Sequence, residues 1–81
     1  MWYVYILRSL TDGRHYIGST SNLDKRVARH NSGGNVSTKH RRPFELIYSE
    51  KYNTKVEAIA RELKIKSYKG GGEFKKLVVE R

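Results

Sequence analysis

The feature that most constrains the fold is a hairpin signal near the N-terminus. Residues 2–8, WYVYILR, are β-branched and aromatic, and residues 14–20, RHYIGST, follow the pair Asp12-Gly13. Two runs with high strand propensity, separated by an Asp-Gly turn, predict an antiparallel β-hairpin. The second run is unusual because it combines a tyrosine and a glycine where branched aliphatic residues are common.

The register of this hairpin places two tyrosines on one face of the sheet. A loop over residues 10–13 pairs Leu7 with Tyr16 and Tyr5 with Gly18. Paired residues share a face, so these side chains line one side, and Gly18 leaves a notch opposite Tyr5. The rings are either ordinary core aromatics with their hydroxyls at the rim or part of a site. Aromatic cross-strand pairs are common, so geometry alone favours the first interpretation.

The rest of the chain alternates helix and strand signals. A helix is expected in residues 21–34, with a cap at Ser21-x-x-Asp24 and a stop at Gly33-Gly34. Pro43 precedes a strand over residues 44–52, Thr54-x-x-Glu57 opens a second helix, and residues 73–81 form a third. The order is ββαβαα, an α/β (α+β) fold with a small three-stranded antiparallel sheet flanked by helices, and residues 1–81 form a single domain.

Helical periodicity also predicts which side chains face the core. On the second helix, apolar residues recur at spacings i, i+3, i+4 and i+7, which is typical of a buried stripe. These residues are Val56, Ile59, Ala60 and Leu63. On the third helix the inward residues are Phe74, Leu77 and Val78.

The composition indicates a polyanionic partner. Seventeen Lys and Arg against eight Asp and Glu give a net charge of +9, which points to nucleic acid. Cysteine is absent, so thiol nucleophiles, disulfides and cysteine-based zinc sites are excluded. Because no apolar run approaches the ~20 residues needed to span a bilayer, and no signal peptide is seen, we expect a cytoplasmic protein with no membrane partner. The sequence carries no signal for an oligomeric state.

Three polar side chains lie at the edges of the predicted apolar stripes. Arg26 and His30 are four residues apart on the first helix, beside Leu23 and Val27. They are expected to emerge at the edge of the packed face. Glu62 has a similar position on the second helix, where a carboxylate is either a surface residue or a ligand turned toward a site. Each of these signals is weak alone.

Their joint spacing is more specific. Tyr3-Val4-Tyr5 is followed by Tyr16-Ile17-Gly18, then by Arg26 and, on a later helix, by Glu62. This arrangement resembles the GIY-YIG endonuclease family over nearly the whole chain. It is closest to small standalone members, which are relatives of the nuclease domain at the N-terminus of an excinuclease. Tyr3 stands where the family name has glycine. The C-terminal asparagine of several larger members has no counterpart here.

The resemblance implies hydrolysis of a phosphodiester with one metal ion. Glu62 would hold Mg²⁺ (or Mn²⁺), and Arg26 would stabilise charge on the phosphate in the transition state. Tyr5 is the preferred general base, with Tyr16 orienting water or phosphate, although the reverse assignment is open. Cationic neighbours are expected to lower the pKa of the tyrosine from about 10. His30 and His40 would relay a proton or contact phosphate.

Basic residues are concentrated between the first helix and the third strand. Outside the candidate site they are expected to bind phosphates with little base specificity. These nucleic-acid-binding residues are Lys25, Arg29, Lys39, His40, Arg41 and Arg42. The three histidines include His15, which faces away from the tyrosines, so we expect no structural zinc site.

Two functions fit the sequence. The first is a metal-dependent endonuclease that acts on DNA, single-stranded or branched, with RNA as another substrate to consider. The second is a nucleic-acid-binding module on the same fold that does not cut. The presence of Tyr5, Tyr16, Arg26 and Glu62 together favours the nuclease. We expect these four residues and His30 to converge on one face of the sheet within a single shallow cleft.

Overall fold

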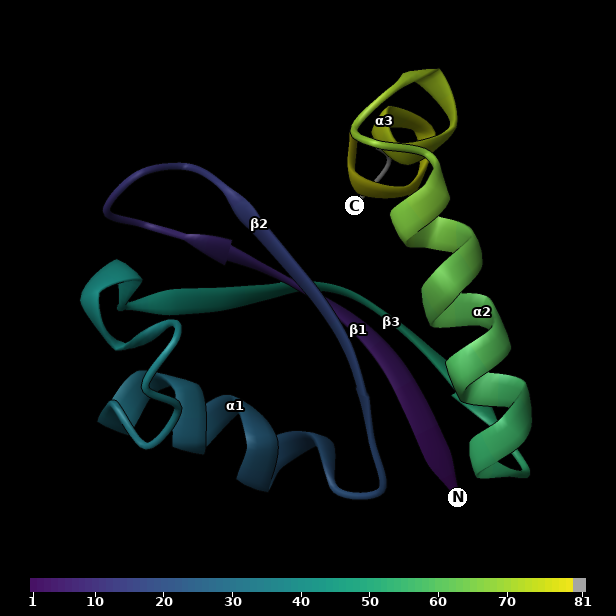
Figure 1. Cartoon of the computed structure of the whole chain (residues 1–81), viewed down its shortest axis with the longest axis horizontal. Helices are drawn as coiled ribbons and strands as arrows, with labels where there is room; N and C mark the ends of the chain where they lie inside the picture. Colours follow the sequence, from purple (N-terminus) through teal and green to yellow (C-terminus); the bar gives the residue numbers. More distant parts are fainter. Residues whose placement is uncertain (80–81) are drawn as a thin grey trace.

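The computed structural model describes residues 1–79 and contains the predicted order of strands and helices. In Figure 1 the helix over Leu23–Ser32 lies on one side of the strands, and the helices over Lys55–Ser67 and Gly72–Val79 lie on the other. The last two residues of the expected third helix lie outside the described range. The short η1 turn was not anticipated by the sequence. The elements are β1 (Trp2–Ser9), β2 (His15–Thr20), α1 (Leu23–Ser32), η1 (Lys39–Arg41), β3 (Phe44–Tyr52), α2 (Lys55–Ser67) and α3 (Gly72–Val79).

The sheet has the strand order β2-β1-β3, with β1 antiparallel to both neighbours. The predicted hairpin register is confirmed, since Leu7 pairs with Tyr16 and Tyr5 pairs with Gly18. β2 is therefore an edge strand within the described residues. This edge position matters for the site, because side chains from both faces of the sheet can reach it.

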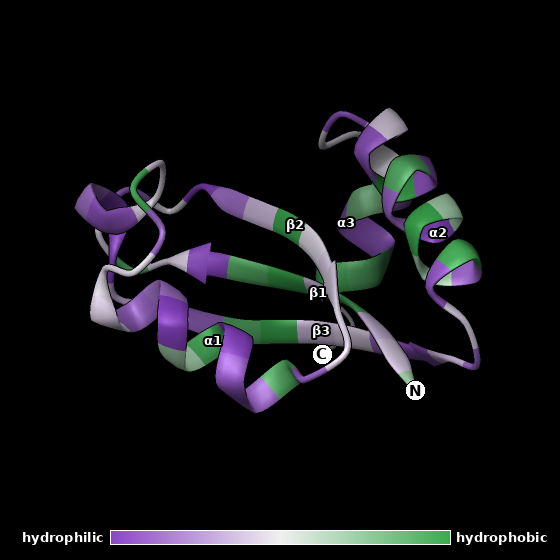
Figure 2. Cartoon of the chain, turned by 60° about the horizontal axis from the view of Figure 1, so that its bottom comes forward, coloured by the Kyte–Doolittle hydropathy of each residue, from purple (hydrophilic) through white to green (hydrophobic). Residues whose placement is uncertain are grey.

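The central strand supplies a core to each face of the sheet. Val4 and Ile6 are fully buried in one cluster, and Tyr5 and Leu7 are fully buried in the other. A strand with side chains covered on both faces reads as a nearly continuous apolar run, as residues 2–7 do. Helices α2 and α3 cover the Val4 face, and α1 covers the Tyr5 face, an arrangement visible in Figure 2.

Helix α1 is capped by Asn22, so the predicted Ser21 cap is wrong. The Asn22 side chain accepts a hydrogen bond from the Lys25 backbone at 3.0 Å, and Gly33 ends the helix with a positive φ of 82°. Thr20 Oγ1 in turn accepts from the Asn22 backbone at 3.1 Å, which fixes the cap at the end of β2. Either residue type is a good cap, and this local bond with Thr20 selects Asn22.

Helix α2 has the predicted capping box but not the predicted buried face. Thr54 and Glu57 make both reciprocal bonds of the box. However, Val56 is 78% exposed and Leu63 is 60% exposed, whereas Ala58 and Ile65 are fully buried. The small Ala58 side chain lets the helix approach β1 closely, so this second face packs against the sheet.

A polar cluster explains why this face of α2 is preferred. The Arg61 guanidinium binds both oxygens of Glu50 on β3, at 2.8 and 3.0 Å. Glu50 also accepts hydrogen bonds from the hydroxyls of Tyr48 and Tyr52. A bidentate, partly buried ion pair of this kind has a fixed geometry. Turning α2 to bury Val56 and Leu63 would break this pair and expose Ala58 and Ile65.

Helix α3 packs as expected, with Phe74 buried and Leu77 and Val78 against the core on the Val4 face. Its Phe74 ring contacts His15, with ring centroids 5.0 Å apart. His15 therefore lies on the face opposite Tyr5 and Tyr16, as predicted. Within residues 1–79, no helix has the length and apolar character needed to cross a bilayer.

Candidate active site

The site is built around Tyr5, whose ring lies across Gly18 on the edge strand. A Cβ added at Gly18 would lie 2.6 Å from the Tyr5 hydroxyl oxygen and 2.8 Å from the carbon that carries it. The notch predicted at Gly18 is thus filled by the Tyr5 ring rather than open. Glycine is required at this position because it lets the Tyr5 hydroxyl reach toward the edge of the sheet.

His30 fixes the Tyr5 hydroxyl from the α1 side. Its Nε2 lies 3.3 Å from the Tyr5 hydroxyl oxygen, and its Nδ1 lies 3.0 Å from Thr38 Oγ1. His30 and Thr38 are both buried. The Thr38 hydroxyl donates to the Asn35 carbonyl at 3.4 Å, so it accepts from His30 Nδ1–H. His30 Nε2 is then the acceptor for the Tyr5 hydroxyl proton.

The electrostatics keep His30 neutral and Tyr5 protonated. Burial, and then the positive charges of Arg26 and Arg29, lower the pKa of His30 from its ordinary value. Burial and the neighbouring Tyr16 raise the pKa of Tyr5 to about 12, and Glu62 adds to the rise. Arg26 lowers this pKa through its charge and a hydrogen bond, but not enough to offset burial. The expected lowering by a cationic neighbour is therefore present at Tyr5, but burial outweighs it and the net pKa lies above its ordinary value.

Tyr16 completes the aromatic part of the site. Its ring stacks on Tyr5 with centroids 6.3 Å apart, and it approaches the His30 ring at 4.6 Å. Unlike Tyr5, Tyr16 is only half-buried. It is thus the tyrosine that borders solvent, and Tyr5 is the one locked by packing and by His30.

Arg26 lies in a cationic pocket at the start of α1. A hollow of about 420 Å³ is lined by Arg26 together with Lys25 and Arg29, and by Thr20, Ser21 and Asn22. Arg26 is half-buried, and Lys25 and Arg29 are exposed. Three cations around a polar hollow suit a phosphate, because arginine forks match phosphate oxygens.

Glu62 reaches the site from the other face of the sheet. Its helix packs on Val4 and Ile6, and its Oε1 accepts a hydrogen bond from Ser19 Oγ of β2 at 2.7 Å. Ser19 neighbours Gly18 and points to the opposite face. Glu62 therefore approaches around the free edge of β2. The prediction that all five site residues share one face is therefore wrong for Glu62. Tyr5, Tyr16, Arg26 and His30 lie on the Tyr5 face, whereas Glu62 comes to the edge of β2 from the other face, near enough for its charge to raise the pKa of Tyr5.

The donor set near Glu62 fits magnesium rather than zinc. Among residues 1–79, no group of three His, Cys, Asp or Glu side chains could enclose a metal ion. Magnesium is commonly held by one or two carboxylates, with waters and substrate phosphates as its other ligands. The Glu62 side chain is only 16% exposed and is oriented by Ser19, so it offers one fixed carboxylate of this kind.

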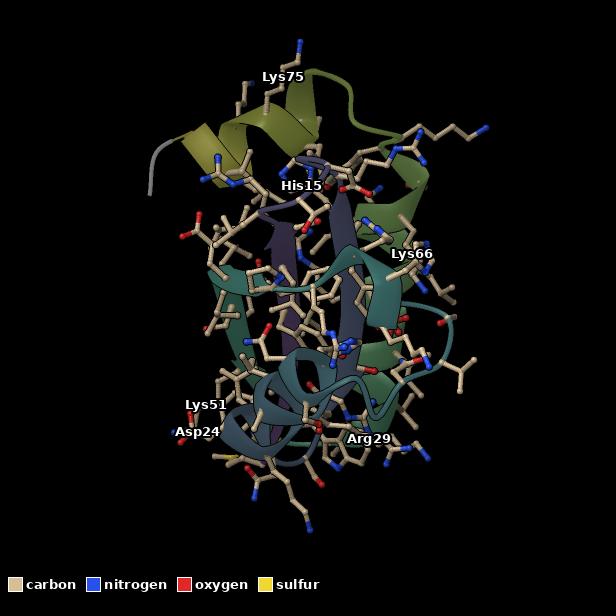
Figure 3. The ribbon with its side chains drawn as sticks, turned by 90° about the vertical axis from the view of Figure 1, so that its left-hand side faces the viewer. His15, Asp24, Arg29, Lys51, Lys66 and Lys75 are labelled. Atoms are coloured by element: carbon tan, nitrogen blue, oxygen red, sulfur yellow. The ribbon has the colours of Figure 1, made fainter. Side chains whose placement is uncertain are left out.

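Most of the predicted nucleic-acid-binding residues are free to contact a ligand. Lys25, Arg29, Lys39, His40 and Arg42 are exposed. In Figure 3, Arg29 from α1 and Lys66 from α2 lie on the same side of the view.

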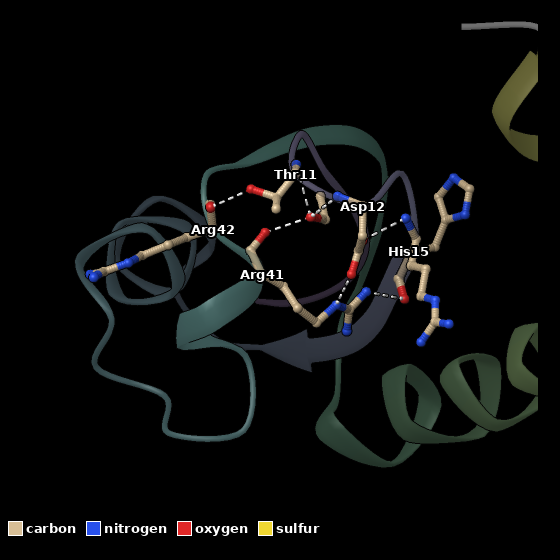
Figure 4. A network of polar contacts seen from close by, with 7 residues as sticks. Thr11, Asp12, His15, Arg41 and Arg42 are labelled. Carbon is tan, nitrogen blue, oxygen red and sulfur yellow. Dashed lines mark hydrogen bonds and ion pairs between the residues drawn. The ribbon is translucent and has the colours of Figure 1, made fainter.

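Arg41 differs from its neighbours in this loop. Its Nε lies 3.2 Å from Asp12 Oδ2, and its terminal nitrogen donates to the His15 carbonyl at 3.4 Å. Its backbone carbonyl accepts from Ser9 Oγ, and the next carbonyl, of Arg42, accepts from Thr11 Oγ1 at 2.7 Å. Figure 4 shows this network joining the hairpin turn to the loop before β3. Arg41 thus has a structural partner before any ligand is present.

Sequence reasoning missed three side chains that support the site. Thr38 orients His30, Ser19 orients Glu62, and Lys66 forms an ion pair with Glu62 at 2.6 Å. Ser19 directly follows the Tyr16-Ile17-Gly18 motif, and Lys66 is four residues after Glu62, so their positions carried a signal. Thr38 had none, because it lies in a polar loop whose path depends on tertiary contacts.

The fold and the edge site define a class of small α+β domain. In it, a β-hairpin that carries two tyrosines lies next to one helix that supplies an arginine and another that supplies a glutamate. The sequence pattern of the GIY-YIG catalytic domain matches residues 1–75. The chain belongs to this family, which is a nuclease family.

Its relatives are similarly small proteins. A UPF0213 protein of Staphylococcus epidermidis is 48% identical over 67 residues, covering 82% of this chain and 80% of the relative. A UPF0213 protein of Staphylococcus saprophyticus is 43% identical over the same coverage. The solution NMR structure of UPF0213 protein BH0048 from Bacillus halodurans superposes with a TM-score of 0.54 at 35% identity, covering 99% of this chain and 84% of that one. This likeness confirms the predicted fold class.

Proposed function

We propose that the protein is a metal-dependent endonuclease that hydrolyses phosphodiester bonds in DNA. The observation that carries the proposal is the position of the Tyr5 hydroxyl, across a glycine that makes room for it. It lies beside neutral His30 and Arg26, and near enough to Glu62 to be affected by its charge. A core tyrosine with a purely structural role would not need a buried, neutral histidine as its acceptor and a cation beside it.

Substrate binding rests on the basic surface of α1 and the loop before β3. The strand backbone follows Lys25 and Arg29, with Lys39 and Arg42 as additional contacts, and one phosphate enters the pocket at Arg26. Such contacts position a strand without reading its bases. We therefore expect affinity that falls with salt and depends little on sequence.

Water activation proceeds through a relay, because a pKa of about 12 leaves almost no free Tyr5 phenolate at neutral pH. The Tyr5 hydroxyl proton passes to His30 Nε2 as the tyrosine oxygen takes a proton from the attacking water. The water oxygen forms a bond to phosphorus, and the bond from phosphorus to the leaving oxygen breaks. The leaving oxygen takes a proton from solvent, and His30 then releases its proton. Tyr5 is neutral before and after this step.

Two further groups stabilise the transition state. Arg26 presents a permanent charge to the phosphate oxygens, where negative charge accumulates during attack. Glu62, oriented by Ser19, would hold one Mg²⁺ or Mn²⁺. The ion supplies Lewis-acid polarisation of a phosphate oxygen when bound. Tyr16, at the border with solvent, orients the water or the phosphate.

A non-cleaving nucleic-acid-binding module is the second candidate. Tyr5 is fully buried, and its raised pKa opposes a role as a base acting alone. On this alternative, Tyr5 and His30 form a structural polar core beneath a basic surface. The relay predicts catalysis despite the raised pKa, so the two candidates differ in a direct assay.

The test is a cleavage panel on end-labelled single-stranded DNA, duplex DNA, flap DNA and RNA, with Mg²⁺ and separately with Mn²⁺. The nuclease cuts at least one substrate only when a divalent ion is present, and Arg26→Ala does not. A binding module shifts all four substrates in a gel-shift assay and cuts none of them. Cleavage of RNA alone would support the chemistry but overturn the DNA assignment.

A further inference from the structure

Lys66 holds the carboxylate on which the proposed metal site depends. It lies one turn after Glu62 on α2, and its Nζ lies 2.6 Å from Glu62 Oε2. The other carboxylate oxygen accepts from Ser19 Oγ at 2.7 Å. Both oxygens of Glu62 are therefore engaged, one by a neutral hydroxyl and the other by a positive charge.

The ammonium group and a divalent ion compete for the same oxygen. Mg²⁺ binds carboxylate oxygens at about 2.0–2.1 Å, so an ion on Oε2 would lie within a few ångströms of the present Nζ position. Two cations at that separation repel each other. The Ser19 hydroxyl carries no charge and can stay in place. Metal binding on the Lys66 side thus requires this ammonium to leave.

Lys66 is able to leave, whereas Glu62 is not. The Lys66 side chain is 49% exposed, whereas that of Glu62 is only 16% exposed. The four-carbon stem of lysine is also flexible. Glu62 is also held by Ser19 on the neighbouring strand. When the pair separates, the carboxylate keeps its orientation and the ammonium swings toward solvent. A nucleic-acid phosphate at the edge of β2 would offer the displaced ammonium a new partner.

We propose, on the basis of the nuclease function proposed above, that Lys66 occupies the cation position at Glu62 in the free protein and is exchanged for the metal when nucleic acid binds. Lys66 weakens metal binding before substrate arrives and releases this restraint afterwards. Because linkage is reciprocal, bound nucleic acid raises metal affinity and bound metal raises nucleic-acid affinity. The exchange lowers the occupancy of the metal site in the absence of substrate.

The test measures Mn²⁺ binding directly, by the loss of the free aqueous Mn²⁺ signal in electron paramagnetic resonance. Lys66→Gln keeps helix propensity and removes the charge. Lys64→Gln is the matched control, because it removes one charge from the same helix but, two residues from Glu62, faces another side. Glu62→Gln reports binding at other places. Circular dichroism confirms that all three fold.

Lys66→Gln is expected to bind Mn²⁺ about fivefold more tightly than the parent, which corresponds to about 1 kcal/mol. Lys64→Gln should match the parent, and Glu62→Gln should lose the site. The same comparison is repeated in an Arg26→Ala background, which prevents cutting. There, adding a single-stranded oligonucleotide should narrow the difference in Mn²⁺ affinity between the protein with Lys66 and the protein with Lys66→Gln.

Equal or weaker Mn²⁺ binding by Lys66→Gln, with binding still lost in Glu62→Gln, overturns the exchange and leaves the metal site intact. An equal gain in Lys64→Gln also overturns it, because net charge alone would then explain the effect. If Glu62→Gln binds Mn²⁺ as the parent does, the proposed metal ligand itself is wrong. If the difference in Mn²⁺ affinity is the same with and without the oligonucleotide, metal binding at Glu62 is not coupled to nucleic-acid binding through Lys66.

Discussion

Replacing Gly18 with alanine tests the packing that positions Tyr5. The new Cβ would lie 2.6 Å from the Tyr5 hydroxyl oxygen, 2.8 Å from its Cζ and 3.2 Å from Tyr16 Cε1. Contacts below about 3 Å are strongly repulsive, and Tyr5 is fully buried, so its ring has little room to move. The substitution must shift the ring or the strand. Either shift changes the 3.3 Å contact between the hydroxyl and His30.

The expected cost follows from overpacking of a close-packed core, which is typically about 1–3 kcal/mol. A value of about 2 kcal/mol corresponds to a fall in Tm of roughly 8–16 °C for a domain of this size. Part of this cost comes from the Tyr5 hydroxyl oxygen, the nearest atom. The double variant Gly18→Ala with Tyr5→Phe should therefore be less destabilised than the sum of the two single variants.

The assay is thermal unfolding followed by circular dichroism, together with cleavage and gel shift at a temperature where the variant is folded. Gly72→Ala is the control, because a Cβ there meets nothing within 4 Å and its φ is ordinary. We expect Gly18→Ala to lose cleavage and keep nucleic-acid binding, and Gly72→Ala to change neither. A Gly18→Ala variant with the parent Tm and full cleavage would refute the packing argument.

Three other outcomes follow from the site. Tyr5→Phe should fold and bind nucleic acid but lose at least about 100-fold in cleavage rate, because only the relay hydroxyl is removed; a rate within threefold of the parent would contradict the relay. Lys39 and Arg42 can be neutralised together while Arg41, which is paired with Asp12, is kept. Fluorescence anisotropy should then show a slope of log affinity against log salt that is smaller by at most ~2. An unchanged slope would exclude this loop from phosphate binding. Burial lowers the pKa of His30, so the unfolded chain binds this proton more readily and the free energy of unfolding falls as pH drops below ~6.5. In urea titrations between about pH 5 and 7.5, His30→Gln should flatten that fall. An identical fall in the variant would mean that another group is responsible for it.

The hairpin and the helix-start signals were predictable because local chemistry decides them. The Asp12-Gly13 turn sets the pairing of Tyr5 with Gly18, and the Thr54 capping box sets the start of α2. Once this register is known, the alternation of side chains places both tyrosines on one face. The class of fold and the tyrosine side of the candidate site thus follow from short stretches of sequence.

The orientation of α2 was not predictable in the same way. The helix carries two apolar stripes, and periodicity favours the one with Val56 and Leu63, which is exposed. The choice between them rests on Ala58 and on the long-range pair of Arg61 with Glu50. The approach of Glu62 around the edge of β2, rather than from the tyrosine face, is a consequence of this same orientation.

The protonation state of the site also depends on tertiary structure. Arg26 near a tyrosine indicates a lowered pKa, yet full burial of Tyr5 dominates and raises it to about 12. Burial depth is set by α1 and by Phe44, which pack over the ring from distant parts of the chain. The relay through His30 becomes apparent only when these contacts are known.

The most direct test of the proposed chemistry compares the parent protein with Glu62→Gln on the substrate that the cleavage panel identifies. Glutamine keeps the volume and helix propensity of Glu62 but lacks the charge that would hold the metal. The predicted result is Mg²⁺-dependent cleavage by the parent, none by Glu62→Gln, and nearly equal nucleic-acid affinity, because binding rests on the lysines and arginines. Equal cleavage by both proteins would contradict the account, as would a parent protein that binds nucleic acid and never cuts it.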